Sequence, residues 1–416
     1  MKCLLPGMRT GSVHVPSSKS IAHRLLICAA LGKDPVHIRL SGLSDDILAT
    51  AGCLEVLGAG IQMEKDGITV TPIRKGTDVE AVLPCRESGS TLRFLLPLAG
   101  ALGIPARFLM EGRLSSRPMA EFEETLRAGG MKLSREGNVL RCAGKLMNGN
   151  FSLRGDVSSQ YFSGLLFSLP LLEGESRLSV MGTMESEGYV RLTEACLQQA
   201  GIFYEKGGGF WQIPGEQRPR LPDTVVTEGD WSNAAFFLCL GALSENGITL
   251  SGLKPASLQG DSAVLKILQA FGAEIRMDSD WISIRKGSCR AMTIDASPIP
   301  DLVPVLSVLA CAAKGETRIV KAARLRFKES DRLRSTAALI CSLGGNAEEL
   351  PDGLLIHGTG MLNGGTADSF RDHRIAMSAA VASAICKHEV IVLNEECVKK
   401  SYPAFWKDYD GMEREA

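Results

Sequence analysis

The sequence predicts an α/β protein of two domains, each built from three copies of one helix-and-strand unit. Two patterns support this prediction: one recurs at intervals of roughly 70 residues, and a second recurs in phase with it. The length of 416 residues agrees, because it exceeds one ordinary hydrophobic core and two or three domains are expected.

The first pattern is a run of small and apolar residues that ends in a polar break and precedes an alternating strand. In the first copy, Ala29-Ala30-Leu31-Gly32 stands before Val36-His37-Ile38. The corresponding later breaks are at Gly103, Gly174, Gly247, Gly315 and Lys387. An apolar run followed by alternation is typical of a buried helix followed by a half-buried strand.

The second pattern is an amphipathic helix that ends at glycine and precedes two short alternating runs. The glycines are Gly58, Gly129, Gly201, Gly272 and Gly344. Glycine suits the left-handed residue that closes a helix. Each unit therefore reads as apolar helix, strand, amphipathic helix, glycine and two strands.

The last unit is cut short, because its second helix, near residues 403–409, meets Gly411 and then the end of the chain. We expect residues 3–15 to supply its missing strands, which would place both termini in one domain. The period alone would also fit a solenoid. However, the units share no short consensus and their polar positions differ, which favours two closed domains of three units.

Composition excludes several classes of protein. With 46 basic and 47 acidic side chains the net charge is −1, which gives no sign of a nucleic-acid or membrane partner. No apolar run is long enough for a transmembrane helix, and residues 1–7 do not resemble a signal peptide. The 12 cysteines stand singly, so we expect reduced thiols in a cytoplasmic protein and no metal site.

Polar residues gather at the expected starts of helices. N-capping explains serines and aspartates such as Asp230 and Ser232. It does not explain cations, which the helix dipole disfavours there. The cations at or near such starts are Lys19, Arg24, Arg93, Arg117, Lys328, Arg332 and Arg374. Because helix N-termini with adjacent cations bind anions, these residues predict a ligand with several phosphate or carboxylate groups.

Other site chemistries have less support. No Walker loop is present, and no GxGxxG follows a strand, so nucleotide binding is not indicated. His23 lies on an apolar helix, where packing and ligand contact are equally good explanations. His373, between Asp372 and Arg374, is better explained as an orienting group than as a catalyst. No Cys/His or Ser/His/Asp arrangement is visible.

Seven segments, in order along nearly the whole chain, resemble the 5-enolpyruvylshikimate-3-phosphate synthase family. They are residues 16–24 (PSSKSIAHR), 117–119, 158–160, 300–301, 325–333 (LRFKESDRL), 372–377 and 400–403. The resemblance implies two inside-out α/β barrels, with crossovers near residues 15–17 and 227–228. The domains would be 17–227, mainly on the shikimate 3-phosphate side, and 1–16 plus 228–416, with much of the phosphoenolpyruvate side. The active site would lie in the interdomain cleft.

The resemblance also implies the reaction and its residues. The enolpyruvyl group of phosphoenolpyruvate would pass to the 5-hydroxyl of shikimate 3-phosphate by addition and elimination, without metal or cofactor, in a monomer. Asp301, Glu329 and Lys19 would be catalytic. Phosphoenolpyruvate would bind to Lys19, Gly89, Arg117, Gln160, Arg332, Arg374 and Lys400. Shikimate 3-phosphate would bind to Lys19, Ser20, Arg24, Ser158, Ser159, Gln160, Ser186, Tyr189, Asp301 and Lys328.

Two positions depart from the family pattern, and two alternatives remain. The glycine loop reads Glu87-Ser88-Gly89-Ser90 where Asn-Ala-Gly-Thr is usual, and Arg324 stands where many members have Asn. One alternative is a UDP-N-acetylglucosamine enolpyruvyl transferase, but residues 111–117 lack the reactive cysteine typical of that family. The other is a non-catalytic homologue that keeps the anion site.

Overall fold

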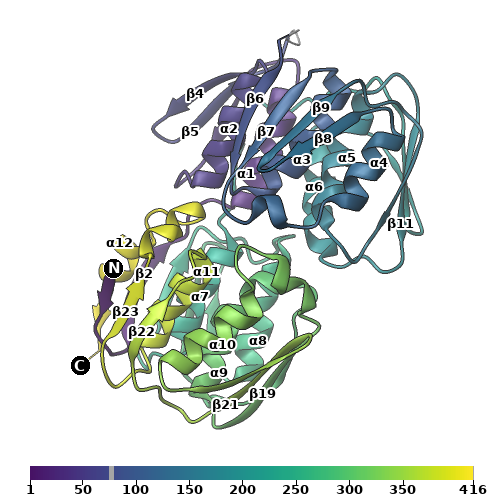
Figure 1. Ribbon diagram of the computed structural model, residues 1–416. Coiled ribbons are helices and arrows are strands. Elements are labelled where there is room, and N and C mark those ends of the chain that lie inside the picture. Colours follow the sequence, from purple (N-terminus) through teal and green to yellow (C-terminus); the bar gives the residue numbers. More distant parts are fainter. Residues whose placement is uncertain (75–78, 416) are drawn as a thin grey trace. The chain divides into compact units, whose positions relative to one another are not determined.

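The computed structural model describes residues 1–74 and 79–415, and the chain divides into two compact units (Figure 1). One unit spans Lys19–Thr227, and the other joins Met1–Ser18 to the segment from Glu228 onward. The expected boundary at residues 16 and 17 thus falls two residues earlier than the contacts place it. Ser17 forms a bridge with Gly229, and the Ser18 amide donates to the Glu228 carbonyl at 2.8 Å, so both serines lie with the termini.

In the described residues of the Lys19–Thr227 unit there are three apolar and three amphipathic helices with three four-stranded sheets. The apolar helices are α1 (Lys19–Ala30), α3 (Gly89–Leu102) and α5 (Ser159–Ser168), and the amphipathic ones are α2 (Asp45–Val56), α4 (Ala120–Ala128) and α6 (Glu187–Gln199). Two 3₁₀ turns are η1 (Leu114–Ser116) and η2 (Leu169–Leu171). The strands of the first sheet are, in order, β14 (Thr224–Val226), β3 (Val36–Arg39), β5 (Gly67–Thr71) and β4 (Gly60–Glu64). Those of the second are β6 (Ala81–Arg86), β7 (Ala106–Met110), β9 (Val139–Ala143) and β8 (Lys132–Glu136). Those of the third are β10 (Asn150–Arg154), β11 (Ser176–Met181), β13 (Phe210–Ile213) and β12 (Glu205–Gly207).

The unit with both termini repeats this plan. Its apolar helices are α7 (Trp231–Gly241), α9 (Val303–Ala312) and α11 (His373–Ser383), and its other helices are α8 (Val264–Phe271), α10 (Arg332–Ser342) and α12 (Phe405–Asp410). Its 3₁₀ turns are η3 (Gly260–Ala263), η4 (Pro300–Leu302), η5 (Ala323–Phe327) and η6 (Glu395–Lys400). The strands of its first sheet are, in order, β16 (Glu274–Met277), β17 (Trp281–Arg285), β15 (Ile248–Ser251), β2 (Arg9–His14) and β24 (Glu413–Arg414). Those of the second are β18 (Thr293–Asp295), β19 (Gly315–Val320), β21 (Gly353–Gly358) and β20 (Asn346–Leu350). Those of the third are β1 (Lys2–Leu4), β23 (Val390–Leu393) and β22 (Gly365–Asp368).

Each of the first five repeats has one strand more than the sequence predicts. After the glycine-terminated helix and its hairpin, a third strand precedes the next apolar helix, as β6 precedes α3. This strand pairs in parallel with the strand that follows the apolar helix, so that Ala81 of β6 lies opposite Ala106 of β7. The helix is therefore the crossover of a β-α-β unit, a connection that packs it onto the sheet.

Two strands, β2 and β14, have exchanged pairing partners at the points where the chain passes between the units. Although β2 directly precedes α1, it pairs in parallel with β15, while β14 pairs in parallel with β3. The expectation that residues 3–15 complete the last repeat is correct for β1, which pairs with β23. It is correct only in part for β2, which pairs with β24 of the last repeat but also with β15.

Each unit buries its own apolar core around its three apolar helices. In the Lys19–Thr227 unit the core includes Leu26 of α1, Leu95 of α3 and Leu166 of α5, all fully buried. Figure 1 shows helices inside each unit and sheets around them. A helix that is apolar on all sides belongs in such an interior. No helix in the described part of the chain combines the length and apolar character needed to cross a bilayer.

Candidate active site

Three carboxylates converge on the buried guanidinium of Arg332, the first residue of α10. Its Nη1 donates to Asp301 Oδ1 at 2.8 Å, and its Nη2 donates to Glu329 Oε2 at 2.8 Å. Its Nε and Nη2 donate to the two oxygens of Asp372 at 2.8 and 3.2 Å. Burial acts to lower the pKa of Arg332, but the three carboxylates outweigh it and hold the pKa above its usual value.

Asp301, in η4, lies among three cations. Besides Arg332, it accepts from Lys328 Nζ at 3.3 Å and from Arg374 Nη2 at 3.3 Å. Burial acts to raise its pKa and Glu329 adds to that effect, whereas Lys328, Arg374 and Arg332 lower it. The combined effect of the three cations exceeds that of burial and Glu329, so the pKa of Asp301 is held well below its ordinary range. Asp301 is therefore a carboxylate at neutral pH.

Helix caps place these side chains. Asp331 caps α10 by accepting from the Arg334 amide at 3.2 Å, which fixes Arg332 in the first turn. Asp372 caps α11 by accepting from the Arg374 amide at 2.9 Å. Asp372 thus both starts a helix and pairs with Arg332. Lys400 ends η6, which packs against α11, and its side chain is buried.

In the Lys19–Thr227 unit, two guanidinium groups lie at the start of α3. A Cβ atom added at Gly89 would come within 2.6 Å of Arg93 Nη1 and 3.0 Å of Arg117 Nη1. Arg93 Nη1 donates to Gln160 Oε1 at 2.8 Å, and Gln160 Nε2 donates to Ser90 Oγ at 3.0 Å. The contacts bring together the predicted ligands Gly89, Arg117 and Gln160. They add Arg93, which the sequence marks only as a cation one turn after Gly89.

Lys19 begins α1, as predicted, and is paired with a carboxylate. Its Nζ lies 2.8 Å from Asp46 Oδ2, in the first turn of α2, and the Asp46 carboxylate is buried. Ser44 caps α2 by accepting from the Ile47 amide, which sets the position of Asp46. Nothing in the local sequence pattern links Lys19 to Asp46, because 27 residues separate them.

The predicted shikimate 3-phosphate ligands lie on α1, α5 and α6 and on elements of the other unit. Ser158 caps α5 by accepting from the Gln160 amide at 3.3 Å, and Ser159 is the first residue of that helix. Ser186 precedes α6 with φ of +53°, a left-handed conformation that is strained for serine. Strain of this kind is common at functional sites.

Arg24 has a structural part as well. It is buried on α1, and its Nε donates to Thr193 Oγ1 at 2.9 Å. Its Nη1 donates to the Ser20 carbonyl at 2.6 Å, and its Nη2 donates to the Tyr189 carbonyl at 2.7 Å. Burial lowers the pKa of Arg24 to about 10, so it keeps its charge at neutral pH. Arg24 therefore connects two predicted ligand segments: the start of α1 with Ser20, and α6 with Tyr189.

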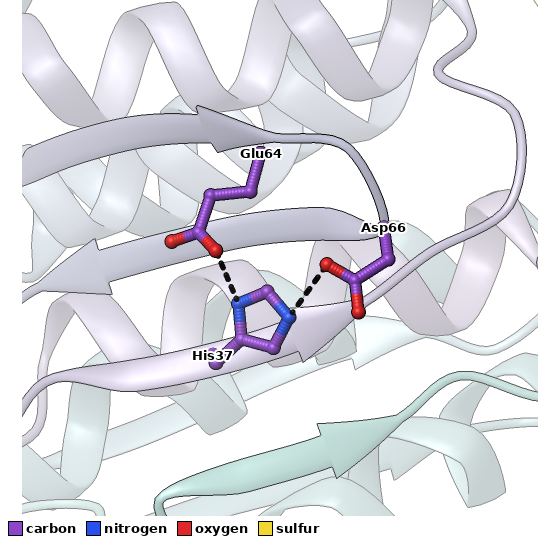
Figure 2. Close-up of side chains that lie close together, drawn as sticks. All are labelled: His37, Glu64 and Asp66. Carbon is purple, nitrogen blue, oxygen red and sulfur yellow. Dashed lines mark ion pairs between the residues drawn. The ribbon is translucent and has the colours of Figure 1, made fainter.

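One group of side chains among the described residues has the spacing of metal ligands: His37, Glu64 and Asp66. Figure 2 shows the two carboxylates at different nitrogens of the ring: Nδ1 lies 3.7 Å from Glu64, and Nε2 lies 3.3 Å from Asp66. Nδ1 also lies 3.0 Å from Thr69 Oγ1. Because one ion occupies one ring nitrogen, the geometry favours a hydrogen-bonded histidine over a metal centre.

The chain matches the family model described as EPSP synthase (3-phosphoshikimate 1-carboxyvinyltransferase) over residues 6–409. It is 41% identical over 415 residues to the 3-phosphoshikimate 1-carboxyvinyltransferase of Clostridium perfringens strain SM101, covering 98% of this chain and 97% of the relative. The same-named protein of Clostridium beijerinckii is 40% identical over 421 residues, covering 98% and 96%. A solved structure of EPSP synthase from Acinetobacter baumannii superposes with a TM-score of 0.80 at 25% identity, covering 98% of this chain and 97% of that one.

Repeated α/β units with cations and carboxylates gathered at helix starts are typical of a protein that binds anionic ligands. The comparisons make the assignment specific: the chain belongs to the EPSP synthase family of enolpyruvyl transferases. The reaction of this family, in aromatic biosynthesis, moves the enolpyruvyl group of phosphoenolpyruvate to shikimate 3-phosphate.

Proposed function

We propose that this protein carries out that transfer with the carboxylates held by Arg332 as its acid and base. The observation that supports this proposal is the shared guanidinium: the buried Arg332 holds Asp301 and Glu329 in one hydrogen-bonded network. The reaction needs a base for the 5-hydroxyl and an acid for C3 of phosphoenolpyruvate, and two carboxylates with different partners can divide these roles.

In the proposed mechanism, the Asp301 carboxylate accepts the proton of the 5-hydroxyl as its oxygen bonds to C2. With three cations around it, Asp301 would be a weak base. Lys328 and Arg374 are proposed substrate ligands, and when they turn toward substrate anions the pKa of Asp301 should rise. Substrate binding would thus create the base that the first step requires.

Glu329 is the proposed acid. In its protonated form it would give a proton to C3 during addition, producing a tetrahedral intermediate, and it would take a proton back from C3 as phosphate leaves. The proton that Asp301 took from the 5-hydroxyl would pass to the leaving phosphate. The carboxylate is fixed toward Arg332 at 2.8 Å, which limits its motion. Lys19 would share in proton transfer and stabilise the developing negative charge.

Anion binding would use both units. Phosphoenolpyruvate would be held by the predicted ligands Lys19, Gly89, Arg117 and Gln160 from one unit and Arg332, Arg374 and Lys400 from the other. We add Arg93 to this set, because its guanidinium lies with Arg117 at Gly89. Shikimate 3-phosphate would be held by Lys19, Ser20, Arg24, Ser158, Ser159, Gln160, Ser186, Tyr189, Asp301 and Lys328. We infer that both units contribute residues to the active site.

The test is phosphate release from phosphoenolpyruvate. We expect release with shikimate 3-phosphate and none with phosphoenolpyruvate alone or with UDP-N-acetylglucosamine as acceptor. Release with the nucleotide sugar would favour the rival transferase instead. Tight binding of both substrates without release would favour a non-catalytic homologue, against the proposed roles of Asp301 and Glu329.

We also propose that the protein acts as a cytoplasmic monomer. The cysteines are scattered and mostly buried, and none of them is in a disulfide among the described residues, which supports a reducing compartment. Light scattering of the purified protein at working concentration should give the mass of one chain, and a dimer mass would contradict the proposal.

A further inference from the structure

Asp261 is a buried carboxyl that the proposed mechanism does not use. It lies in η3 with 3% of its surface exposed. Its Oδ2 accepts a hydrogen bond from the Ser232 hydroxyl, and its Oδ1 has no hydrogen-bond partner among the described residues. A buried carboxylate with an unsatisfied oxygen is costly, so such a group is expected to be neutral part of the time or to have a specific task.

Three hydrogen bonds lead from Asp261 to Asp301, one of the proposed catalytic residues. Ser232 lies in the first turn of α7, and its carbonyl accepts from Arg374 Nη1 at 3.0 Å. Arg374 Nη2 in turn pairs with Asp301 Oδ2 at 3.3 Å. Arg374 is itself buried, and its Nε has no partner among the described residues. The path therefore runs from Asp261 through Ser232 and Arg374 to Asp301.

Charged groups from every element packed on η3 act on Asp261 or lie near it. Burial is the largest influence and raises its pKa, and Asp301 of η4 and Asp230 at the α7 cap also raise it. Arg374 of α11 and the Ser232 hydrogen bond lower it. On α8 the ionisable side chain is Lys266, which is exposed. The balance brings the pKa of Asp261 to about 7.

We propose that Asp261 is a positioning residue that sets how much of the Arg374 charge is available to the substrate anion. When Asp261 is neutral, the Arg374 guanidinium interacts with Asp301 and the bound anion. When Asp261 is ionised, it adds a second carboxylate near Arg374 and opposes anion binding. The inference rests on the proposed role of Arg374 in binding phosphoenolpyruvate.

The direction of the pH effect follows from the charges. Because ionised Asp261 repels the anion, KM for phosphoenolpyruvate should rise as pH increases through the titration of Asp261, with little change in kcat. One pKa unit of coupling corresponds to about a tenfold change in KM. The phosphate of the substrate also titrates in this range, so each variant is compared with wild type at every pH, and that common effect cancels.

The experiment measures KM and kcat from about pH 6 to about pH 8.5 for wild type, Asp261→Asn and Ser232→Ala. The Asn variant should keep a low KM at high pH, so that its KM becomes about tenfold lower than that of wild type there. The Ala variant should shift the rise in KM to higher pH, because it loses the hydrogen bond that favours the ionised form. Asp278→Asn, at an exposed turn, is the matched control and should follow wild type.

An Asn variant whose KM follows the wild-type profile would overturn the proposal. So would a uniform loss of kcat with an unchanged profile, because that outcome describes a purely structural residue. If the Asn variant does not fold, the Ala variant decides, and an unshifted KM profile counts against the proposal. Wild-type protein that releases no phosphate at any pH would overturn the proposed function and this inference together.

Discussion

At the scale of single residues, one buried cation organises the acids of the proposed site. Arg332 contacts Asp301, Glu329 and Asp372, yet the three carboxylates have different surroundings. Asp301 faces two further cations, Asp372 is fully buried at a helix start, and Glu329 is slightly exposed. Because environment sets proton affinity, identical groups can take different roles, which is how we separate base, acid and support.

The role of Glu329 predicts that Glu329→Gln is folded and nearly inactive. An amide keeps the size of the side chain but cannot transfer the proton, so kcat should fall by about 10²- to 10⁴-fold with little change in shikimate 3-phosphate affinity. Steady-state kinetics and titration calorimetry would measure the two effects. The exposed Glu348→Gln is the control. If Glu329 is only a partner of Arg332, the variant should lose stability and keep most of its turnover.

The proposed role of Lys19 predicts a different change in the kinetic constants. Its charge would serve both substrate binding and the transition state, so Lys19→Met should raise KM for phosphoenolpyruvate and also lower kcat. The substitution also removes the ammonium group that pairs with the buried Asp46 carboxylate, so the variant should unfold at lower urea concentration than wild type. Kinetics beside urea titration separate these effects. Unchanged KM would contradict the proposed contact with substrate.

The residues that sequence predicts and those that it misses differ in a physical way. Lys19, Arg332 and Arg374 are visible because cations at helix starts contradict the helix dipole. Asp372 looks like an ordinary cap, and its pairing with Arg332 depends on a contact 40 residues away. Asp261 has no sequence signal, because its importance comes from burial and from neighbours that only the fold provides.

At the scale of elements, the helices, the hairpins and the strand after each apolar helix follow from sequence, whereas the strand before the next apolar helix does not. Periodicity and terminal glycine are local signals, and they place α2 and its hairpin of β4 and β5 correctly. A strand such as β14 has three residues and pairs with β3, which lies far away in the sequence. For the same reason, no local sequence pattern predicts that β2 pairs with β15 and that β14 pairs with β3.

The start of α3 predicts the effect of Gly89→Ala. The new Cβ would push on Arg93 Nη1 at 2.6 Å, and that group is the end of a flexible side chain. Stability should change little, while KM for phosphoenolpyruvate should rise about tenfold as Arg93 and Arg117 move. Gly52→Ala, inside α2 with no atom within 4 Å of the added carbon, is the matched control. It should leave KM unchanged and stabilise the helix by up to about 1 kcal/mol. Equal KM values for both variants would contradict this account.

The start of α11 predicts a pH-dependent stability. The pKa of Asp372 is lowered: burial opposes ionisation, but Arg332 and His373 outweigh it. Its stabilising effect is therefore present above the unfolded-state pKa of about 3.9 and is lost as pH falls through the folded-state value. Asp372→Asn should cost about 3 kcal/mol at about pH 7 and progressively less in acid. Urea unfolding over this range measures the cost, and a cost that does not change with pH would be evidence against the ion pair.

At the scale of the whole molecule, the chain forms two units that each have a complete core. It passes between them at Ser18–Lys19 and at Thr227–Glu228. The proposed ligands are divided in the same way, with Arg117 and Gln160 in one unit and Arg332 and Arg374 in the other. Neither unit alone contains all the groups that the reaction needs. The proposed function therefore requires the two units to work together on one pair of substrates.

This division predicts that substrate brings the units together. Without ligand, the cations on the two units should repel each other, and the anions of shikimate 3-phosphate should remove that repulsion. Solution scattering should show a smaller radius of gyration when shikimate 3-phosphate is added at saturating concentration. Shikimate without the phosphate is the control, and it should give a weaker effect because it lacks the charge that Lys328 and Arg24 would bind. If closure depends mainly on shikimate 3-phosphate, the radius of gyration of the Arg374→Ala variant should still decrease when this ligand is added, since Arg374 is assigned to the other substrate. A radius of gyration that does not change at saturation would show that the units do not close on this ligand.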